Sequence, residues 1–488
     1  MTEDESGSVR RRSLQGFRWT AVQTAVLALI GPLSQIIKAR FLLPEELGAV
    51  AVLMIIYGLL HTLERSGLGQ SIVQADELTC SGTFTYLVAA MAIGLMGSAA
   101  MFASAEVVQR LFAVPGSAQL IRLGSPLLFL TMLDQVARAL LHRDLRFRGT
   151  SAIEMVKRAV NLTSLWVLLA AGQGALSVVL SMLLATAVSS VLLTALVLRG
   201  GAIRLAARVD RNVLRHLWSF GSRVGVKQLF TYFTHRADEL IIGIALTPEA
   251  LGVYHLAKET LDRLRSLITA AFSKVLLSLF ARIKDDRARL SRVYERVLLM
   301  VSYVGAPVFI GIALTADLIV PVVFGEAWVA AVTPFRFLAI AMIPIVLTAN
   351  LSTSLLYALG DARAALRIEL VLNLPYLAAL FLASRTGLLA VLLVYVLYCF
   401  IKGVVLQYAS GRRLEKGVLL QLKTITRALL RVVPMVVAVI AVTFLLQGHV
   451  TPTTELVAVI AVGAAAYAGS VLLTDRGVLR EFKLILHG

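Results

Sequence analysis

The chain of 488 residues is both hydrophobic and basic: 58% of its residues are hydrophobic, and its formal net charge is +18. Charged residues make up only 16% of the chain, whereas a soluble domain carries about 25%, so a water-exposed surface of this size could hardly be covered. The composition argues against a soluble enzyme, a DNA-binding protein and a disordered scaffold. It indicates a membrane protein.

Apolar runs that match the thickness of a bilayer follow one another along the chain, because about 20 apolar residues in a helix cross the hydrocarbon core. The first run, Phe17–Ile37, follows Arg10–Arg12 and is too long for a cleaved signal peptide, so we expect a retained membrane helix. Eleven further runs are predicted as membrane helices: Gly48–Leu63, Thr83–Ser104, Ile121–Leu141, Ile153–Ala171, Gly174–Leu198, Val293–Ala316, Thr333–Ala358, Ala365–Arg385, Gly387–Ala409, Arg427–Gln447 and Thr454–Thr474.

Two weaker runs, His216–Leu246 and Pro248–Phe280, contain several charged residues each. Counting both predicts about fourteen membrane helices with both termini on one side. The distribution of Lys and Arg supports this count, because the segments on the side of the termini are rich in basic residues and that side should be cytoplasmic. The outer loops are expected to be short, and the longest span about residues 106–120 and 317–332. Their only basic residues are Lys38, Arg40, Arg110 and Arg385.

An internal repeat relates the two halves of the chain. Leu43–Val50 resembles Thr247–Tyr254, and Pro, Glu, Leu and Gly coincide. Both segments are predicted helix starts at the outer surface, where Pro has no N–H to lose and Glu faces the positive end of the helix dipole. A second pair of segments, Gly174–Val178 and Gly387–Val391, keeps nearly the same register. Helices one to six and seven to twelve are therefore predicted to be parallel copies of one bundle.

The predicted domain organisation follows from this repeat, with two helices left over at the C-terminal end. The segment that joins the copies carries five Arg residues among apolar ones, which predicts an amphipathic helix on the inner leaflet. The predicted parts are a cytoplasmic tail (1–16), an N-lobe (17–198), the basic linker (199–216), a C-lobe (217–409), two further helices with a preceding basic loop (410–474), and a cytoplasmic tail (475–488).

Several segments resemble the polysaccharide transporter (oligosaccharidyl-lipid flippase) family of the multidrug/oligosaccharidyl-lipid/polysaccharide exporter superfamily. Their order and spacing carry the resemblance across about residues 12–415, although Thr247 stands where the family commonly has Gly. The segments are Ala39–Gly48, Gly67–Gln74, Arg236–Gly243, Pro248–Tyr254, Phe324–Trp328 and Tyr357–Asp361.

The resemblance implies an all-α membrane protein whose two six-helix lobes form a V around a central hydrophilic cavity. The cavity opens alternately to the two sides. The implied substrate is a polyprenyl-pyrophosphate-linked oligosaccharide, flipped from the inner to the outer leaflet of the cytoplasmic membrane for cell-surface polysaccharide assembly. Membrane lipids surround the protein, and a polysaccharide polymerase and glycosyltransferases would be its functional partners.

Five basic residues in the two charged runs are the candidate substrate-binding groups, because a pyrophosphate that crosses a bilayer needs compensating positive charge. Lys227 is placed about 15 Å from the inner end of its helix, near the middle of the membrane. The alternative for Arg236 is an anchor at the outer headgroups. Lys258 and Arg263 have carboxylates four residues away, which also fits an intrahelical ion-pair ladder. Arg265 has a carboxylate only at position i−3.

Four residues are candidates for ion coupling or gating. Asp134 and Arg138 are spaced i,i+4 inside an apolar run, which predicts either a paired strut or a carboxylate whose pairing changes between states. Asp238 lies beside Arg236 in the first charged run, and Asp262 follows Lys258 by four residues in the second.

No enzymatic centre is predicted. Cys80 and Cys399 have no metal-ligand spacing, and the chain has no Walker A or His-Glu-x-x-His motif, so we expect no cofactor and no metal. An ion-coupled multidrug antiporter of the same superfamily is the alternative function, but basic residues outnumber acidic ones in the predicted helices, which favours anionic cargo. A membrane glycosyltransferase or polymerase is the alternative from another class, and it should have a large outer loop with catalytic residues.

Overall fold

The computed structural model describes residues 30–64, 68–74, 79–144, 146–199, 208–414 and 417–475. All regular structure in these ranges is helical. Ten described helical runs are long and apolar enough to cross a membrane. The prediction of an all-α, multi-pass membrane protein is therefore confirmed, while the count of fourteen and the arrangement of the lobes stay predictions.

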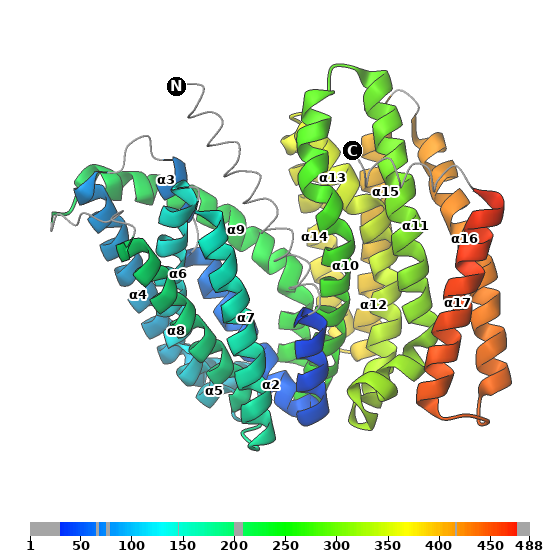
Figure 1. Cartoon of the computed structure of the whole chain (residues 1–488), viewed down its shortest axis with the longest axis horizontal. Coiled ribbons are helices and arrows are strands. Elements are labelled where there is room, and N and C mark those ends of the chain that lie inside the picture. The colour runs from blue at the N-terminus through cyan, green and yellow to red at the C-terminus, as the bar shows by residue number, and fades with distance from the viewer. Residues whose placement is uncertain are drawn as a thin grey trace. The chain divides into compact units, whose positions relative to one another are not determined.

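The helices fall into two compact units, Met1–Gly252 and Val253–Gly488 (Figure 1). In the first unit, α4 packs on α6, and α8 packs on both α6 and α7. Its helices are α2 (Pro44–Glu64), α3 (Leu68–Gln74), α4 (Cys80–Phe112), α5 (Ser117–Gly124), α6 (Pro126–Arg143), α7 (Phe147–Ala170), α8 (Leu176–Arg199) and α9 (Arg211–Ala245).

The second unit contains most of α10 and all later helices, and in it α11 packs on α12 and on α16. Its helices are α10 (Pro248–Arg282), α11 (Arg287–Ile319), the π-helix η1 (Val320–Phe324), the 3-10 helix η2 (Glu326–Ala331), α12 (Val332–Pro344), the π-helix η3 (Ile345–Ala349), α13 (Asn350–Ala358), α14 (Ala362–Ser384), α15 (Leu388–Gly411), α16 (Gly417–Leu446) and α17 (Pro452–Thr474).

The two weak runs of the sequence form the helices α9 and α10, and each has 35 residues. Neither belongs to the ten apolar spans, and α7 does not either, because charged residues interrupt their apolar stretches. The predicted first helix lies mostly outside the described residues, which begin with a helix at residue 30. Helices α7, α9 and α10 form where the sequence predicts them, although composition alone does not mark them as membrane spans.

The linker between the predicted lobes is only partly described. Helix α8 ends at Arg199, and residues 200–207, where most of the predicted amphipathic helix would lie, are outside the described ranges. Asp210 caps α9: its carboxylate accepts hydrogen bonds from the backbone N–H groups of Asn212 and Val213. Residues 211–216 of the predicted linker therefore belong to α9.

The two longest predicted outer loops, 106–120 and 317–332, are mostly helical in the structure, so the predicted loop boundaries are wrong there. Helix α4 continues to Phe112, and α5 begins at Ser117, so only four residues connect them. The turn between them has Ala113 at φ 51° and Gly116 at φ 77°. The helices η1 and η2 similarly occupy most of residues 317–332. A hydropathy pattern ends where apolar residues end, whereas a helix continues through exposed polar residues until the backbone geometry changes.

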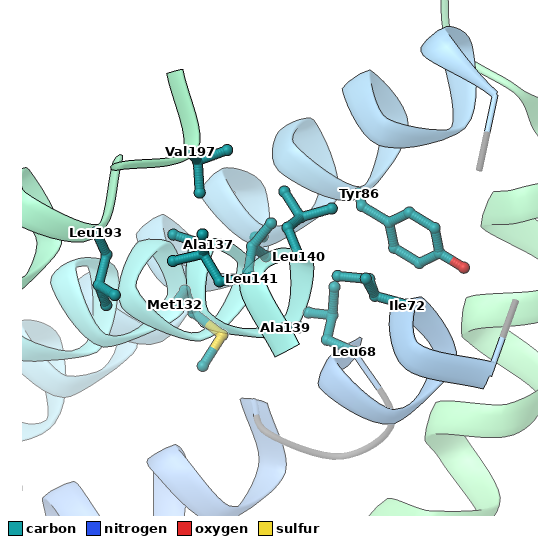
Figure 2. Close-up of a cluster of buried hydrophobic side chains, with 12 residues drawn as sticks. Leu68, Ile72, Tyr86, Met132, Ala137, Ala139, Leu140, Leu141, Leu193 and Val197 are labelled. Carbon is teal, nitrogen blue, oxygen red and sulfur yellow. The ribbon is translucent and has the colours of Figure 1, made fainter. Parts of the chain in front are cut away.

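Buried apolar residues of α3, α4, α6 and α8 form the core around the candidate site of the first unit (Figure 2). Leu68 and Ile72 of the short helix α3 belong to the same cluster as Leu140 and Leu141 of α6. Leu193 adds an apolar contact from α8. This packing fixes the positions of α6 and α8, which carry charged and hydroxyl side chains on a neighbouring face.

The two copies of the repeated helix start meet inside the first unit. A Cβ atom added to Gly48 of α2 would lie 2.2 Å from the Pro248 carbonyl oxygen, and one added to Gly252 of α10 would lie 1.8 Å from the Pro44 carbonyl oxygen. The contact between the two helix starts is therefore reciprocal. The Gly of each motif lies against the Pro carbonyl oxygen of the other motif. Small residues permit this backbone contact between membrane helices.

Helices α16 and α17, the two helices beyond the repeat, are attached to α11 by both apolar and polar contacts. Val432, Met435 and Val439 of α16 share a core cluster with Ala306 of α11. Asp475, immediately after α17, pairs with Arg427 of α16 and accepts a hydrogen bond from the Tyr303 hydroxyl of α11. These contacts hold α16 and the end of α17 against α11.

An ion pair outside the membrane-spanning segments makes one pH-dependent prediction. Hydrogen bonds from the Arg413 guanidinium hold the pKa of Asp361 below its usual value. A carboxylate with a lowered native pKa stabilises the fold above its unfolded pKa, and the contribution disappears as pH falls through the native pKa. We expect Arg413→Gln to lower the melting temperature at pH 7 and to converge with the parent in acid. Thermal unfolding in detergent between pH 7 and pH 3 tests this, and a pH-independent difference would contradict it.

Candidate functional site

The predicted pair on α6 is present at the centre of a larger ionic cluster. The Arg138 guanidinium lies 3.1 Å from the Asp134 carboxylate, as the i,i+4 spacing predicted. The Asp134 side chain is 9% exposed, and its other carboxylate oxygen accepts a hydrogen bond from the Ser189 hydroxyl of α8. Asp134 is therefore satisfied by a charged group of its own helix and a hydroxyl of a neighbouring helix, as a buried carboxylate must be.

Helix α7 completes this cluster with three charged side chains, Glu154, Lys157 and Arg158. Glu154 accepts hydrogen bonds from Arg138 at 3.0 Å and from Arg158 at 3.0 Å, and the Lys157 ammonium lies 3.6 Å from Asp134. Three cations and two carboxylates leave a net charge of +1. The 16-residue separation of Glu154 from Arg138 depends on how α6 and α7 pack, so no local pattern indicates it.

The candidate residues of α9 differ in their surroundings. Lys227 has an exposed side chain, which leaves its ammonium accessible. Arg236 lies 2.5 Å from Glu239, three residues further along α9, and the Glu239 side chain is fully buried. Asp238 is 1% exposed. Near the end of α9, Arg236 therefore pairs with the buried Glu239, and Asp238 is buried as well, while Lys227 is separate from them along the helix.

The candidate residues of α10 are largely paired within their own helix. Arg263 donates to Glu259 at 2.8 Å, which agrees with the ion-pair ladder considered from the sequence. Arg265 donates to Asp262 at 3.0 Å, so it pairs at the i−3 position. Lys258 is 4% exposed, and its ammonium lies 5.8 Å from the centre of the Tyr254 ring, within range of a cation–π contact.

The structure joins some candidates and leaves others apart. Asp134 and Arg138 share one cluster, and Arg263 and Arg265 each form an ion pair within α10. The chemistry available is electrostatic: fixed and exchangeable cations can bind an anion, and paired carboxylates can exchange partners.

Among the described residues, no group of three or more His, Cys, Asp and Glu side chains could hold a metal ion. In the same ranges Cys80 is exposed and Cys399 is buried, and neither forms a disulfide.

The sequence profile of a family described as polysaccharide biosynthesis proteins matches residues 37–333. The chain belongs to this family. The resemblance inferred from the sequence motifs is thereby confirmed.

Similar proteins support the same assignment over most of the chain. The lipopolysaccharide biosynthesis protein WzxC of Escherichia coli (strain K12) is 24% identical over 68% of this chain and 67% of its own length. The succinoglycan biosynthesis transport protein ExoT of Rhizobium meliloti (strain 1021) is 26% identical over 91% of this chain and 90% of its own. The fold is similar to that of the lipid II flippase MurJ in an inward closed conformation, with a TM-score of 0.78, 10% identity, and coverage of 94% of this chain and 99% of that one.

Proposed function

We propose that this family member flips a polyprenyl-pyrophosphate-linked oligosaccharide across the cytoplasmic membrane by alternating access. It acts as a transporter without a catalytic centre. The names of the relatives and the MurJ-like fold support this function. The basic excess of inner loops over outer loops supports an orientation with both termini in the cytoplasm. Two lobes with a cavity between them, the N-lobe at 17–198 and the C-lobe at 217–409, belong to the proposal.

One observation carries the choice of an anionic cargo: cations outnumber carboxylates in the charged helices. The predicted span within α9, His216–Leu246, contains three basic and two acidic residues, and the one within α10, Pro248–Phe280, contains four basic and three acidic residues. Charged side chains at membrane depth are costly, about 2.5–3.5 kcal/mol each on insertion scales, so an uncompensated excess indicates a functional site. A multidrug antiporter for cationic compounds would need the opposite excess.

In the proposed mechanism, the exposed Lys227 ammonium binds the pyrophosphate first. Arg265, Lys258, Arg263 and Arg236 are secondary cations, because each has a carboxylate partner or an aromatic contact that an anionic substrate would displace or share. Asp134, Arg138, Asp238 and Asp262 are the groups whose pairing we expect to change when the protein moves between states. The sugars lie in the hydrated cavity, and the polyprenyl chain stays in the lipid.

Lys227→Ala and Arg265→Ala test this mechanism in proteoliposomes that contain the lipid-linked oligosaccharide. Loss of a charge-assisted contact typically costs about 1.5–3 kcal/mol, so we expect Lys227→Ala to reduce the transport rate about tenfold or more. The effect of Arg265→Ala should be smaller, because that residue is already paired. The readout is the fraction of glycan that becomes accessible to a membrane-impermeant glycosidase over time.

Lys227→Arg is the matched control, because it keeps the charge at the same position. It should retain most of the parent rate. If Lys227→Ala and Arg265→Ala both transport at the parent rate, the assignment of these cations is wrong. If the parent protein moves no lipid-linked oligosaccharide at all, the proposed function is wrong.

A further inference from the structure

A second polar site lies in the second unit, on the facing sides of α14 and α15, and it is separate from every residue considered so far. Glu369, Asn373 and Tyr376 follow one another on α14 at spacings of four and three residues. Tyr398 and Lys402 are spaced by four residues on α15. Each set lies on one face of its helix, and α14 packs against α15.

The two faces are joined by a chain of contacts. The Tyr398 hydroxyl donates to the Asn373 carboxamide oxygen at 2.5 Å, and the Lys402 ammonium donates to the Tyr398 hydroxyl at 3.3 Å. The Lys402 nitrogen is 4.0 Å from the Glu369 carboxylate, and these two side chains are 17% and 30% exposed. Tyr376 stacks on Tyr398 with ring centres 3.9 Å apart. We call these five residues the α14–α15 cluster.

One polar group of the α14–α15 cluster is left unsatisfied. The amide nitrogen of Asn373 is buried and has no hydrogen-bond partner among the described residues, and Asn373 as a whole is 2% exposed. A buried N–H group without an acceptor is costly and rare in native proteins, so the Asn373 amide nitrogen is a donor that an incoming acceptor would satisfy. Lys402 adds donor capacity, because an ammonium has three N–H groups and its carboxylate contact is at the limit of an ion pair.

The cluster lies well inside the apolar span of α15, on a face other than the exposed apolar one. Lys402 precedes the end of α15 by nine residues, which is about 14 Å along the helix and near the middle of a bilayer. The large exposed apolar residues of α15 include Leu393, Leu397 and Val404, which form a different face of the helix. A partly exposed Glu–Lys pair at this depth avoids lipid, so it faces a hydrated part of the protein.

The charge of the cluster decides which part of a substrate it suits. Glu369 cancels the charge of Lys402, so the cluster has no net charge to attract a pyrophosphate. It instead combines hydrogen-bond donors, acceptors and tyrosine rings, the groups that match a sugar, whose hydroxyls both donate and accept and whose C–H faces pack on aromatic rings. Resting on the proposed function, we propose that the α14–α15 cluster is a glycan subsite, which binds a sugar beyond the one attached to pyrophosphate.

In this subsite the Asn373 amide nitrogen donates to a sugar hydroxyl, and Lys402 donates to a second one. Tyr398 holds both side chains in place through its hydroxyl, so it is a positioning residue. The subsite therefore contributes only to substrates that carry a glycan long enough to reach it. Its contribution to a lipid pyrophosphate with a single sugar is zero.

Two substrates separate this inference from the function on which it rests: the lipid pyrophosphate with its full oligosaccharide, and the same lipid pyrophosphate with one sugar. We expect Lys402→Met and Asn373→Ala to slow the flipping of the oligosaccharide lipid about tenfold, as expected for loss of sugar hydrogen bonds. Both variants should move the single-sugar lipid at the parent rate. Lys227→Ala, in contrast, should slow both lipids equally.

Arg412→Met is the matched control, because Arg412 is also a cation over a tyrosine of α15, 5.9 Å from the centre of the Tyr408 ring, but at the end of the helix. It should move both lipids at the parent rate. If Lys402→Met and Asn373→Ala slow both lipids equally, or neither, the glycan subsite is wrong while the proposed function stands. If the parent chain moves neither lipid, the proposed function fails, and the subsite fails with it.

Discussion

Replacement of Arg138 by Met is expected to destabilise the protein by about 2–3 kcal/mol. The substitution removes the guanidinium that joins Asp134 of α6 to Glu154 of α7, and the buried Asp134 carboxylate then keeps only Lys157 and a serine hydroxyl as partners. Breaking a buried ion pair typically costs about 3–5 kcal/mol. The remaining contact with Lys157 reduces the expected loss.

Unfolding in a detergent titration would measure this free energy, and the same cluster supplies the control. Arg158 also pairs with Glu154, but its side chain is 49% exposed. Such a pair contributes about 0–1 kcal/mol, so Arg158→Met should change stability little. Equal effects of the two substitutions would show that burial does not determine the strength of this network. The double variant Asp134→Leu/Arg138→Met should recover only part of the loss, because it removes both charges of the broken pair but takes the Asp134 contact from Lys157.

Gly252→Ala is expected to have the second large effect, a destabilisation of about 1–3 kcal/mol or more. The added Cβ would lie 1.8 Å from the Pro44 carbonyl oxygen. Because that neighbour is backbone, relief requires a shift of α2 or of the first turn of α10. Gly48→Ala makes the reciprocal change, with its Cβ 2.2 Å from the Pro248 carbonyl oxygen, and should behave similarly.

Gly469→Ala is the control for this pair, since nothing lies within 4 Å of the Cβ that it would add. Alanine is a better helix former than glycine by about 0.5–1 kcal/mol, so this substitution should be neutral or stabilising. Thermal unfolding of the three variants in the same detergent compares them directly. A melting temperature of Gly252→Ala at or above that of Gly469→Ala would mean that α2 and α10 do not cross this closely in the folded protein.

The ionic cluster of the first unit shows how far sequence patterns reach into a site. The pairing of Asp134 with Arg138 follows from helical spacing, because residues four apart lie on one face of a helix. The addition of Glu154, Lys157 and Ser189 does not follow from any spacing, because those residues lie on two other helices. The α14–α15 cluster is hidden from the sequence for the same reason, because its contacts join Glu369 and Asn373 of one helix to Lys402 and Tyr398 of another.

The sequence by itself determined the all-helical membrane architecture, the positions of the long described helices, and the family. Hydropathy, helix-start chemistry and ordered motifs are properties of consecutive residues, and they persist in any packing of the chain. Tertiary structure decided which charges meet and where helices end. Only packing brings the repeated Pro-Glu-x-Leu-Gly starts into contact, so that Gly48 and Gly252 serve a crossing as well as a helix start. Burial likewise distinguishes Arg138, whose side chain is 24% exposed, from Arg158, whose side chain is 49% exposed. A sequence pattern cannot tell which of these two arginines contributes more to stability.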